Sequence, residues 1–331
     1  MRTLTRYFWV GLGALVFGVG ILAPRSSAEG LPTFEDFRRV DRARRETGQL
    51  QTAELMKVTQ IDRGLIQRTA LQATNDYQAV WGAAELIGDW PTKRLLFESA
   101  LAASGTNVAV ALRDGCAAAQ KGEFDAAIPL LRIVEKSDPG NGVPWLVELR
   151  FLQVQQKGFA DLKMPALGTV HYRDYAVDAA RARIHLLEAA GYSPYAARRL
   201  GFTPDTPVLA MARQFAEVPI EKAAAPFLLA VAHAMQERPL YLLTELVGQT
   251  LERAAMKADV EEQAGAEVSL RAGELDHRRE EIKALVSTVE RKVVDLATET
   301  EMVRYFDDVL SRGEDVAMHR LAATVQGRPL P

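Results

Sequence analysis

The feature that most constrains the fold is a pattern of residue types that recurs after 34 residues. The stretch 88–107 matches the stretch 122–141 in register. Each begins with a glycine two residues before an aromatic residue and ends with an asparagine. A fixed period of this length is typical of helical repeats, in which each unit buries its apolar face on the next. The sequence therefore predicts stacked helix pairs, whose extended surface suits partner binding better than catalysis.

The first 28 residues have the pattern of a secretory signal peptide. Arg2 and Arg6 precede an apolar run over 7–23, and small residues lead to a cleavage site after Ala28. The alternative is a retained membrane anchor, because a run of 17 residues is nearly long enough to span a bilayer. Both interpretations predict a bacterial chain that is exported across the inner membrane and is periplasmic or envelope-associated.

The composition argues against several classes of function. The formal net charge is −3 and the charges are interspersed, so the sequence predicts no basic surface for nucleic acid. The five histidines lack the i, i+4 spacing of a helical metal site, and there is no phosphate-binding loop or nucleophile motif. Cys116, the single cysteine, lies among alanines and is predicted to be a buried packing residue. We therefore expect no cofactor and no metal.

A run of arginines follows shortly after the predicted signal peptide. Residues 38, 39, 42, 44 and 45 are arginines, and Asp36, Asp41 and Glu46 interrupt them. Because the charges are mixed, a solvated helix face is the favoured interpretation. Contact with a membrane surface or an anionic partner is the alternative.

The rest of the chain is predicted to be helical, because apolar residues recur every three or four positions and alternating β-branched runs are nearly absent. Thr33 and Asp36 are expected to cap a helix over 33–48, and a second helix is expected over 52–73. The predicted segments are N-terminal helices over 29–74, repeats over 75–160, irregular helical repeats over 161–239 and long charged helices over 240–331.

Residues 111–144 form the most complete unit of the repeat. Its characteristic residues are Gly115, Gly122, Phe124, Ala127, Leu131, Val134 and Pro139. This unit resembles a tetratricopeptide repeat, and the resemblance extends over 77–157. The preceding unit departs from the family pattern, with Lys93 where alanine is usual and Gly105 where proline is usual. The resemblance implies an α-solenoid of helix hairpins with a concave groove for a peptide or a partner's helix.

A different period governs the C-terminal part. Apolar residues stand seven apart at Val268, Leu275, Ile282, Val289, Leu296, Val303 and Leu310. This spacing favours a long helix with a coiled-coil-like seam. Arg278, Arg279 and Lys292 interrupt the companion line, and glycines at 265 and 273 allow a helical hairpin. The stripe packs either on the protein's own core or on a second copy, and the sequence leaves both open.

Two groups of residues are candidates for contact with a partner, because tyrosine and arginine are frequent binding anchors. The candidates in the repeats are Asn107, Arg113 and Arg150. The candidates further along are Tyr172, Arg173, Tyr175, Tyr192 and Tyr195. Ordinary aromatic packing between irregular helices is the alternative for the tyrosines.

Together these patterns predict a non-catalytic protein–protein interaction scaffold or adaptor of the bacterial cell envelope, with a peptide or partner helix in the groove. One alternative is a helical-bodied periplasmic enzyme that acts on cell-wall material. The other is a structural envelope protein that self-assembles through 268–310. The enzyme requires an enclosed pocket with converging titratable residues, whereas the scaffold requires an open surface.

Overall fold

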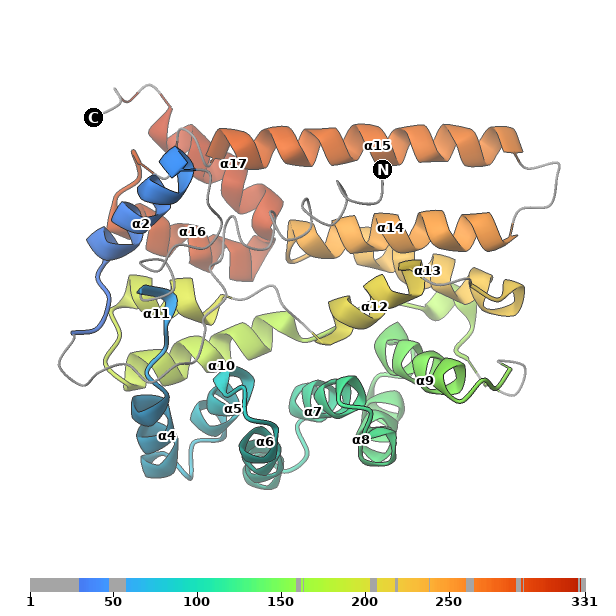
Figure 1. Cartoon of the computed structure of the whole chain (residues 1–331), viewed down its shortest axis with the longest axis horizontal. Coiled ribbons are helices and arrows are strands. Elements are labelled where there is room, and N and C mark those ends of the chain that lie inside the picture. The colour runs from blue at the N-terminus through green and yellow to red at the C-terminus, as the bar shows by residue number, and fades with distance from the viewer. Residues whose placement is uncertain are drawn as a thin grey trace. The chain divides into compact units, whose positions relative to one another are not determined.

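The computed structural model describes residues 30–47, 58–158, 162, 164–202, 207–217, 220–237, 239–259, 265–289, 293, 295–326 and 328. The predicted signal peptide lies outside these residues. The described part is all-α, as predicted, with fifteen α-helices, two short 3-10 helices and no strand (Figure 1). None of its helices is both long enough and apolar enough to cross a membrane.

The chain forms two compact units, and neither is one continuous stretch of sequence. Unit 1 comprises 1–106, 177–204 and 285–331, and unit 2 comprises 107–176 and 205–284. These units cut across the contiguous segments expected from the sequence. The helices of unit 1 are α2 (Phe34–Thr47), α4 (Arg63–Gln72), α5 (Tyr77–Leu86), α6 (Trp90–Ser104), most of α10 (Ala176–Ala189), α11 (Pro194–Gly201), α16 (Glu299–Arg312) and α17 (Glu314–Val325). The helices of unit 2 are α7 (Val108–Gln120), α8 (Phe124–Ser137), α9 (Gly142–Val154), η1 (Leu167–Thr169), α12 (Pro207–Glu217), η2 (Lys222–Ala224), α13 (Ala225–Glu237), α14 (Leu242–Asp259) and most of α15 (Gly265–Thr288).

Local capping residues set the ends of the hairpin helices. Asn107 begins α7 and Asn141 begins α9, and each side-chain oxygen accepts hydrogen bonds from backbone N–H groups of the first turn. The two residues have nearly the same backbone conformation, with φ of −69° in both. Gly105 and Gly122 adopt the left-handed conformation at φ of 64° and 79°, which glycine does without steric cost. Asn107 and Asn141, which are in register in the 34-residue pattern, therefore both act as helix N-caps.

Near the N-terminus one expected helix is confirmed and one is wrong. Thr33 caps α2, because its hydroxyl accepts from the Asp36 N–H while the Asp36 carboxylate accepts from the Thr33 N–H. The expected single helix over 52–73 is interrupted, since residues 60–62 are not helical and α4 begins at 63. Asp62 is the reason: its carboxylate accepts from the Leu65 N–H as an N-cap. An aspartate favours that role over a helix interior.

The first helices of the hairpins are buried over most of their length. Residues 79–84 of α5, 109–119 of α7 and 142–149 of α9 are all buried, Cys116 among them. In unit 1 the backbone of α10 lies so close to α5 that a Cβ built on Gly82 would lie 2.8 Å from the carbonyl carbon of Ala182. In unit 2 helix α12 packs against α7 and α9 (Figure 1). Other helices of the same chain therefore pack against these three hairpin helices.

The spacing favoured one long helix for the heptad stripe. The structure instead divides the stripe between separate helices. Helix α15 ends at Thr288, and α16 begins only at Glu299 behind its own cap, Thr298. On α15 the stripe faces the protein's own core, with Leu275 and Ile282 only 2% and 1% exposed.

On α16 a different set of residues is buried. Met302, Tyr305, Phe306 and Val309 form its core face, whereas Val303 and Leu310 are only partly buried. The sevenfold spacing continues across the break by coincidence of sequence, because each helix sets its own buried face from its own start.

Arginines of α15 hold this helix against α14. Arg271 Nε donates to Glu252 Oε1 at 2.7 Å, and Arg278 Nε donates to Glu245 Oε1 at 2.7 Å. Both carboxylates are buried, whereas both guanidinium groups are more than one-third exposed. The pairs are one heptad apart on each helix, which fixes an antiparallel register. Arg279 adds a hydrogen bond to Thr250 Oγ1 at 3.2 Å.

The contact between α5 and α10 predicts a large effect of one methyl group. Gly82→Ala would push against the α10 backbone, and we expect it to lower the free energy of unfolding by about 1–3 kcal/mol. Thermal unfolding of the full chain measures this as a lower Tm. Gly273→Ala on α15 is the matched control, because no atom lies within 4 Å of its added Cβ. The control should raise stability by about 0.5–1 kcal/mol; equal effects of the two changes would contradict the close contact.

The buried carboxylate of Glu252 predicts acid sensitivity. Burial alone would raise its pKa, but hydrogen bonds from Arg271 and Gln236 outweigh burial and hold the pKa below the usual value. A lowered folded-state pKa stabilises the fold above the unfolded-state value and loses that contribution as the pH falls through the folded-state value. Glu252→Gln should therefore reduce the Tm at pH 7 and flatten the decline in Tm below about pH 5. Glu274→Gln, which removes the exposed partner of Arg271, should leave both nearly unchanged.

Candidate functional site

A loop after α8 and an extended segment before α10 are paired in unit 2. The backbone N–H of His171 donates to the Gly140 carbonyl at 2.9 Å, and the Gly142 N–H donates to the His171 carbonyl at 2.8 Å. These bonds make an isolated parallel bridge between Asn141 and His171. Gly140 permits the approach, because a Cβ there would lie 2.9 Å from His171 Nδ1. We call Asp138, Asn141, His171, Arg173 and Tyr175 the arginine ledge.

The side chain of Asn141 extends the pairing by one further residue. Its Nδ2 donates to the Arg173 carbonyl at 2.8 Å, and its Oδ1 accepts from the Arg173 N–H at 3.3 Å. The same Oδ1 accepts from the Val143 N–H at 3.1 Å as the cap of α9. Asn141 is fully buried. One amide group thus fixes both a helix start and the backbone of Arg173.

Tyr175 fixes the guanidinium of Arg173. The guanidinium carbon lies 4.6 Å from the centre of the Tyr175 ring, within the range of a cation–π contact. The Tyr175 hydroxyl donates to Asp138 at 3.3 Å. Tyr175 has φ of 54°, a left-handed conformation that costs a residue with a side chain about 1–3 kcal/mol. Arg173 is exposed and forms no ion pair within the described part of the chain.

The imidazole of His171 completes the ledge. Its Nε2 lies 2.8 Å from Asp138 Oδ1, and its Nδ1 faces the Thr169 carbonyl at 3.4 Å. The side chain is about half exposed. Both ring nitrogens thus face acceptor oxygens, so the ring is oriented by hydrogen bonds rather than left with a free nitrogen for a substrate proton.

A buried polar group lies beneath the same segment. The Tyr172 hydroxyl donates to Asp174 Oδ2 at 3.0 Å, and the other oxygen of Asp174 accepts from the Ala176 N–H at 3.0 Å. Burial, reinforced by the Asp174 charge, raises the pKa of the Tyr172 hydroxyl well above its usual value, and the charge of Arg113 opposes this. Arg113 is 2% exposed. The structure therefore brings together four predicted residues, of which only Arg173 presents its charge to solvent.

The other predicted residues lie elsewhere. Asn107 caps α7, and Arg150 donates to Gln153 at 2.7 Å. Tyr192 and Tyr195 belong to unit 1, and both are buried there. The Tyr192 hydroxyl accepts from the Asp62 N–H at 3.2 Å, and the Tyr195 ring packs against Phe34 and Phe37. Burial raises the pKa of Tyr195.

The sequence analysis did not identify Asp138 or Asn141 as parts of a site. A signal existed for Asn141, because the 34-residue pattern places it in register with Asn107 as a helix cap. Nothing in the local sequence indicates that the same amide also binds Arg173, which lies 32 residues away.

The chain matches no protein-family model, and no curated protein or solved structure is significantly similar to it. The resemblance to tetratricopeptide repeats therefore remains a prediction from the residues quoted above. Within the described residues, no group of three or more His, Cys, Asp or Glu side chains is placed to hold a metal ion.

Asn141→Asp separates the two tasks of this amide. The variant keeps an acceptor for Val143 and loses the donor to the Arg173 carbonyl, which then faces a carboxylate. We expect α9 to remain capped while backbone amides at 171–173 exchange about tenfold faster by hydrogen–deuterium exchange. Asn107→Asp, which changes a cap in the same register, should leave that exchange unchanged. Similar exchange in the two variants would show that the amide does not hold the segment.

Proposed function

We propose that this chain is an exported, non-catalytic protein–protein interaction scaffold or adaptor of the bacterial cell envelope. The observation that supports it is the arrangement of Arg173: an exposed guanidinium whose backbone is held by Asn141 and whose charged group is stacked on Tyr175. A guanidinium held in place loses little side-chain entropy on binding, and its planar donors match a carboxylate. The partner that fits is a peptide or helix that carries an acidic residue.

We do not place the partner along the first helices of the hairpins. Those helices are largely buried, with α10 packed on α5 in unit 1 and α12 packed on α7 and α9 in unit 2. Binding at the ledge requires no such access. The proposal therefore keeps the class of function inferred from the sequence and moves the contact from the groove to the 138–175 surface.

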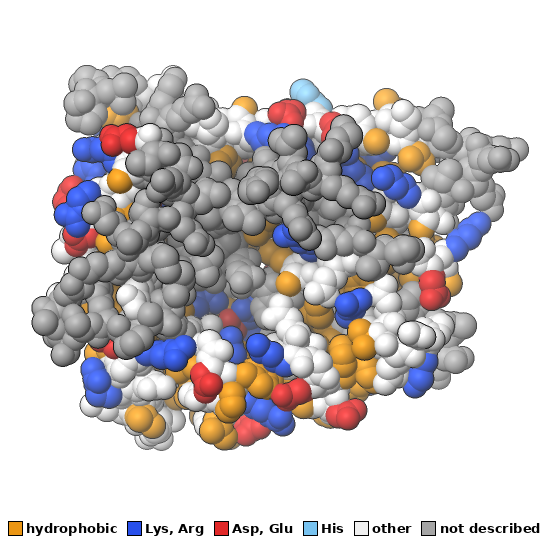
Figure 2. Space-filling view, in the orientation of Figure 1, with side chains coloured by type: hydrophobic (Ala, Val, Ile, Leu, Met, Phe, Trp, Pro, Cys, Tyr) orange, Lys and Arg blue, Asp and Glu red, His pale blue; other side chains and the backbone are white. Residues whose placement is uncertain are grey.

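The charge distribution is compatible with recognition through a local site rather than through a broad field. Acidic and basic side chains are interspersed over the coloured part of the face in Figure 2. Mixed charges of this kind cancel at a distance and leave specificity to close contacts. Arg173, which is exposed and forms no ion pair among the described residues, is then a local exception that a partner's carboxylate can use.

The pair of Asp138 and His171 favours an enzyme as the second candidate. A carboxylate that orients an imidazole is a common arrangement for general-base catalysis. Here the carboxylate and the Thr169 carbonyl face the two ring nitrogens, and we therefore assign His171 to positioning of the ledge.

Site-specific photo-crosslinking tests the proposal in the native envelope. In one variant a photoreactive residue replaces Leu167, which is 50% exposed and lies next to the ledge in sequence. In a separate control variant it replaces the exposed Leu95 in unit 1. We expect a defined protein adduct at 167 whose yield falls about three- to tenfold in Arg173→Ala, because a charge-assisted hydrogen bond is lost. Arg94→Ala, which removes another exposed arginine, should not reduce it.

Two results would contradict the proposal. One is an adduct at 167 that Arg173→Ala leaves unchanged, since the arginine would then not contribute to binding. The other is an adduct that contains only a second copy of this chain, which would support self-assembly. Thermal unfolding of Arg173→Ala guards against a trivial loss, because a change at an exposed side chain should shift stability by no more than about 0.5 kcal/mol.

A further inference from the structure

Helix α2 has one face in the core of unit 1 and a charged face opposite it. Phe34 and Phe37 pack on the ring of Tyr195, and Asp41 forms an ion pair with the buried Arg199 at 3.0 Å. These contacts fix the rotation of the helix. Arg38, Arg39 and Arg42, which belong to the arginine run of the sequence analysis, therefore lie on a helix that is held by the core of unit 1.

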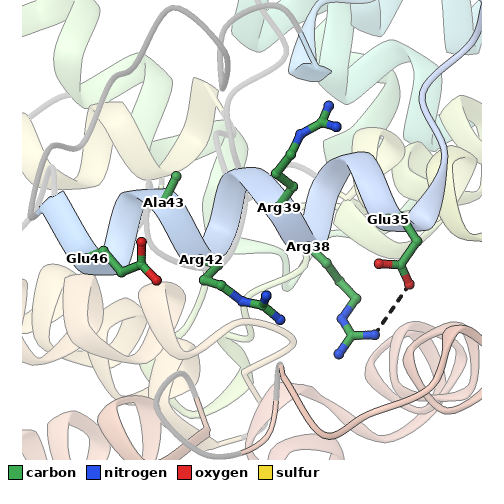
Figure 3. A pocket seen from close by; sticks show the side chains of 6 residues that line it. All are labelled: Glu35, Arg38, Arg39, Arg42, Ala43 and Glu46. Atoms are coloured by element: carbon green, nitrogen blue, oxygen red, sulfur yellow. Dashed lines mark hydrogen bonds and ion pairs between the residues drawn. The ribbon is translucent and has the colours of Figure 1, made fainter. Parts of the chain in front are cut away.

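A pocket of about 240 Å³ lies on that charged face. It is lined by Glu35, Arg38, Arg39, Arg42, Ala43 and Glu46 (Figure 3). The spacing of three and four residues places all six on one side of the helix. The volume equals that of about eight water molecules in the liquid, enough for a small polar group. Among the described residues the lining supplies three cations and two anions, so this part of it suits a ligand that carries both signs.

Neighbouring acids hold two of the arginines in place. Arg38 pairs with Glu35 at 3.3 Å and also donates to the backbone carbonyl of Asp295. Arg39 pairs with Asp36 at 3.0 Å.

Arg42 is more available for a ligand. Its Nε lies 3.8 Å from Asp295, beyond hydrogen-bond length, and its side chain is 53% exposed. Arg38 and Arg42 project from the same side of α2 in Figure 3.

Arg42 and Glu46 have the spacing of a helical ion pair but do not form one. They are four residues apart and both described, yet no ion pair joins them, and the exposed Glu46 carboxylate has no described partner. The same arrangement on α6 behaves differently, because Arg94 and Glu98 pair at 3.2 Å. The charges at 42 and 46 are thus side by side, of opposite sign, and open to a ligand.

We infer that this α2 pocket binds the zwitterionic phosphoethanolamine headgroup of a membrane lipid. Arg42, assisted by Arg38, would take the phosphate, since guanidinium donors match phosphate oxygens. Glu46 would accept hydrogen bonds from the ammonium group. A membrane lipid is the source that fits the retained-anchor alternative of the sequence analysis, in which the apolar run over 7–23 ends eleven residues before α2, a span of at most about 40 Å. This inference is independent of the proposed function.

Native mass spectrometry of the full chain, released from mild detergent, tests the inference. The chain is titrated with phosphatidylethanolamine, phosphatidylglycerol and phosphatidylcholine of identical acyl chains. We expect phosphatidylethanolamine to bind about tenfold more tightly than the other two, because only this lipid offers both a phosphate and a hydrogen-bonding ammonium. Soluble glycerophosphoethanolamine should compete, which separates headgroup recognition from insertion of acyl chains.

Two variants test the roles proposed for Arg42 and Glu46. Arg42→Gln should weaken phosphatidylethanolamine binding about tenfold, and Glu46→Gln should abolish the preference over phosphatidylglycerol while leaving phosphatidylglycerol binding unchanged or stronger. The control variants Arg94→Gln and Glu98→Gln should change neither. Equal binding of all three lipids would show association through the apolar segment alone and overturn the inference. A preference for phosphatidylglycerol would show simple charge attraction and would also overturn it.

Discussion

Close packing of small residues is the constraint on which the rest of this structure depends. Alanine and glycine along α5 and α7 let neighbouring elements approach: Gly82 touches the main chain of α10, and Gly115 faces leucine side chains of α8. Helices that approach this closely become enclosed, so they cannot offer a groove. The surfaces left for function are those built after the helices are packed: the loop that pairs with 171–173 and the outer face of α2.

Features that depend on a few neighbouring residues could be predicted from the sequence. The cap at Thr33, the left-handed glycine at 122 and the helices α7 and α8 follow from local rules, whereas Asn107, expected to contact a partner, is the N-cap of α7. The expected helix over 52–73 failed for an equally local reason, because Asp62 is a stronger N-cap than a helix-interior residue. The prediction of a single helix followed the apolar spacing and left the capping role of Asp62 out of account. The heptad line failed in the same way at Thr298, whose cap starts a new helix with a new buried face.

The candidate site depends on contacts that no local rule contains. Tyr172, Arg173 and Tyr175 were recognisable as residue types that often anchor a partner. In the structure, however, the Tyr175 ring packs against the guanidinium of Arg173. The difference arises from Asn141, which is distant in sequence and adjacent in space. Tyr195 has a different environment, since its ring is buried in the core of unit 1 and packs against Phe34 of α2. Residue type indicates what a side chain can do, whereas long-range pairing decides which face it presents.

The arginines of this chain also differ according to the contacts that hold them. A guanidinium opposite a buried carboxylate, such as Arg271 with Glu252, is committed to the fold, because removing it takes a hydrogen-bonding cation away from a buried charge. Arg173 and Arg42 have similar side chains and no such commitment: one lies on an aromatic ring, and the other is 3.8 Å from its nearest acid. An exposed cation held by its backbone or its helix, rather than by an acid, keeps its full charge for a ligand at little further entropic cost. Arginines of this second kind, and not the composition as a whole, are where binding to other molecules should be sought in this protein.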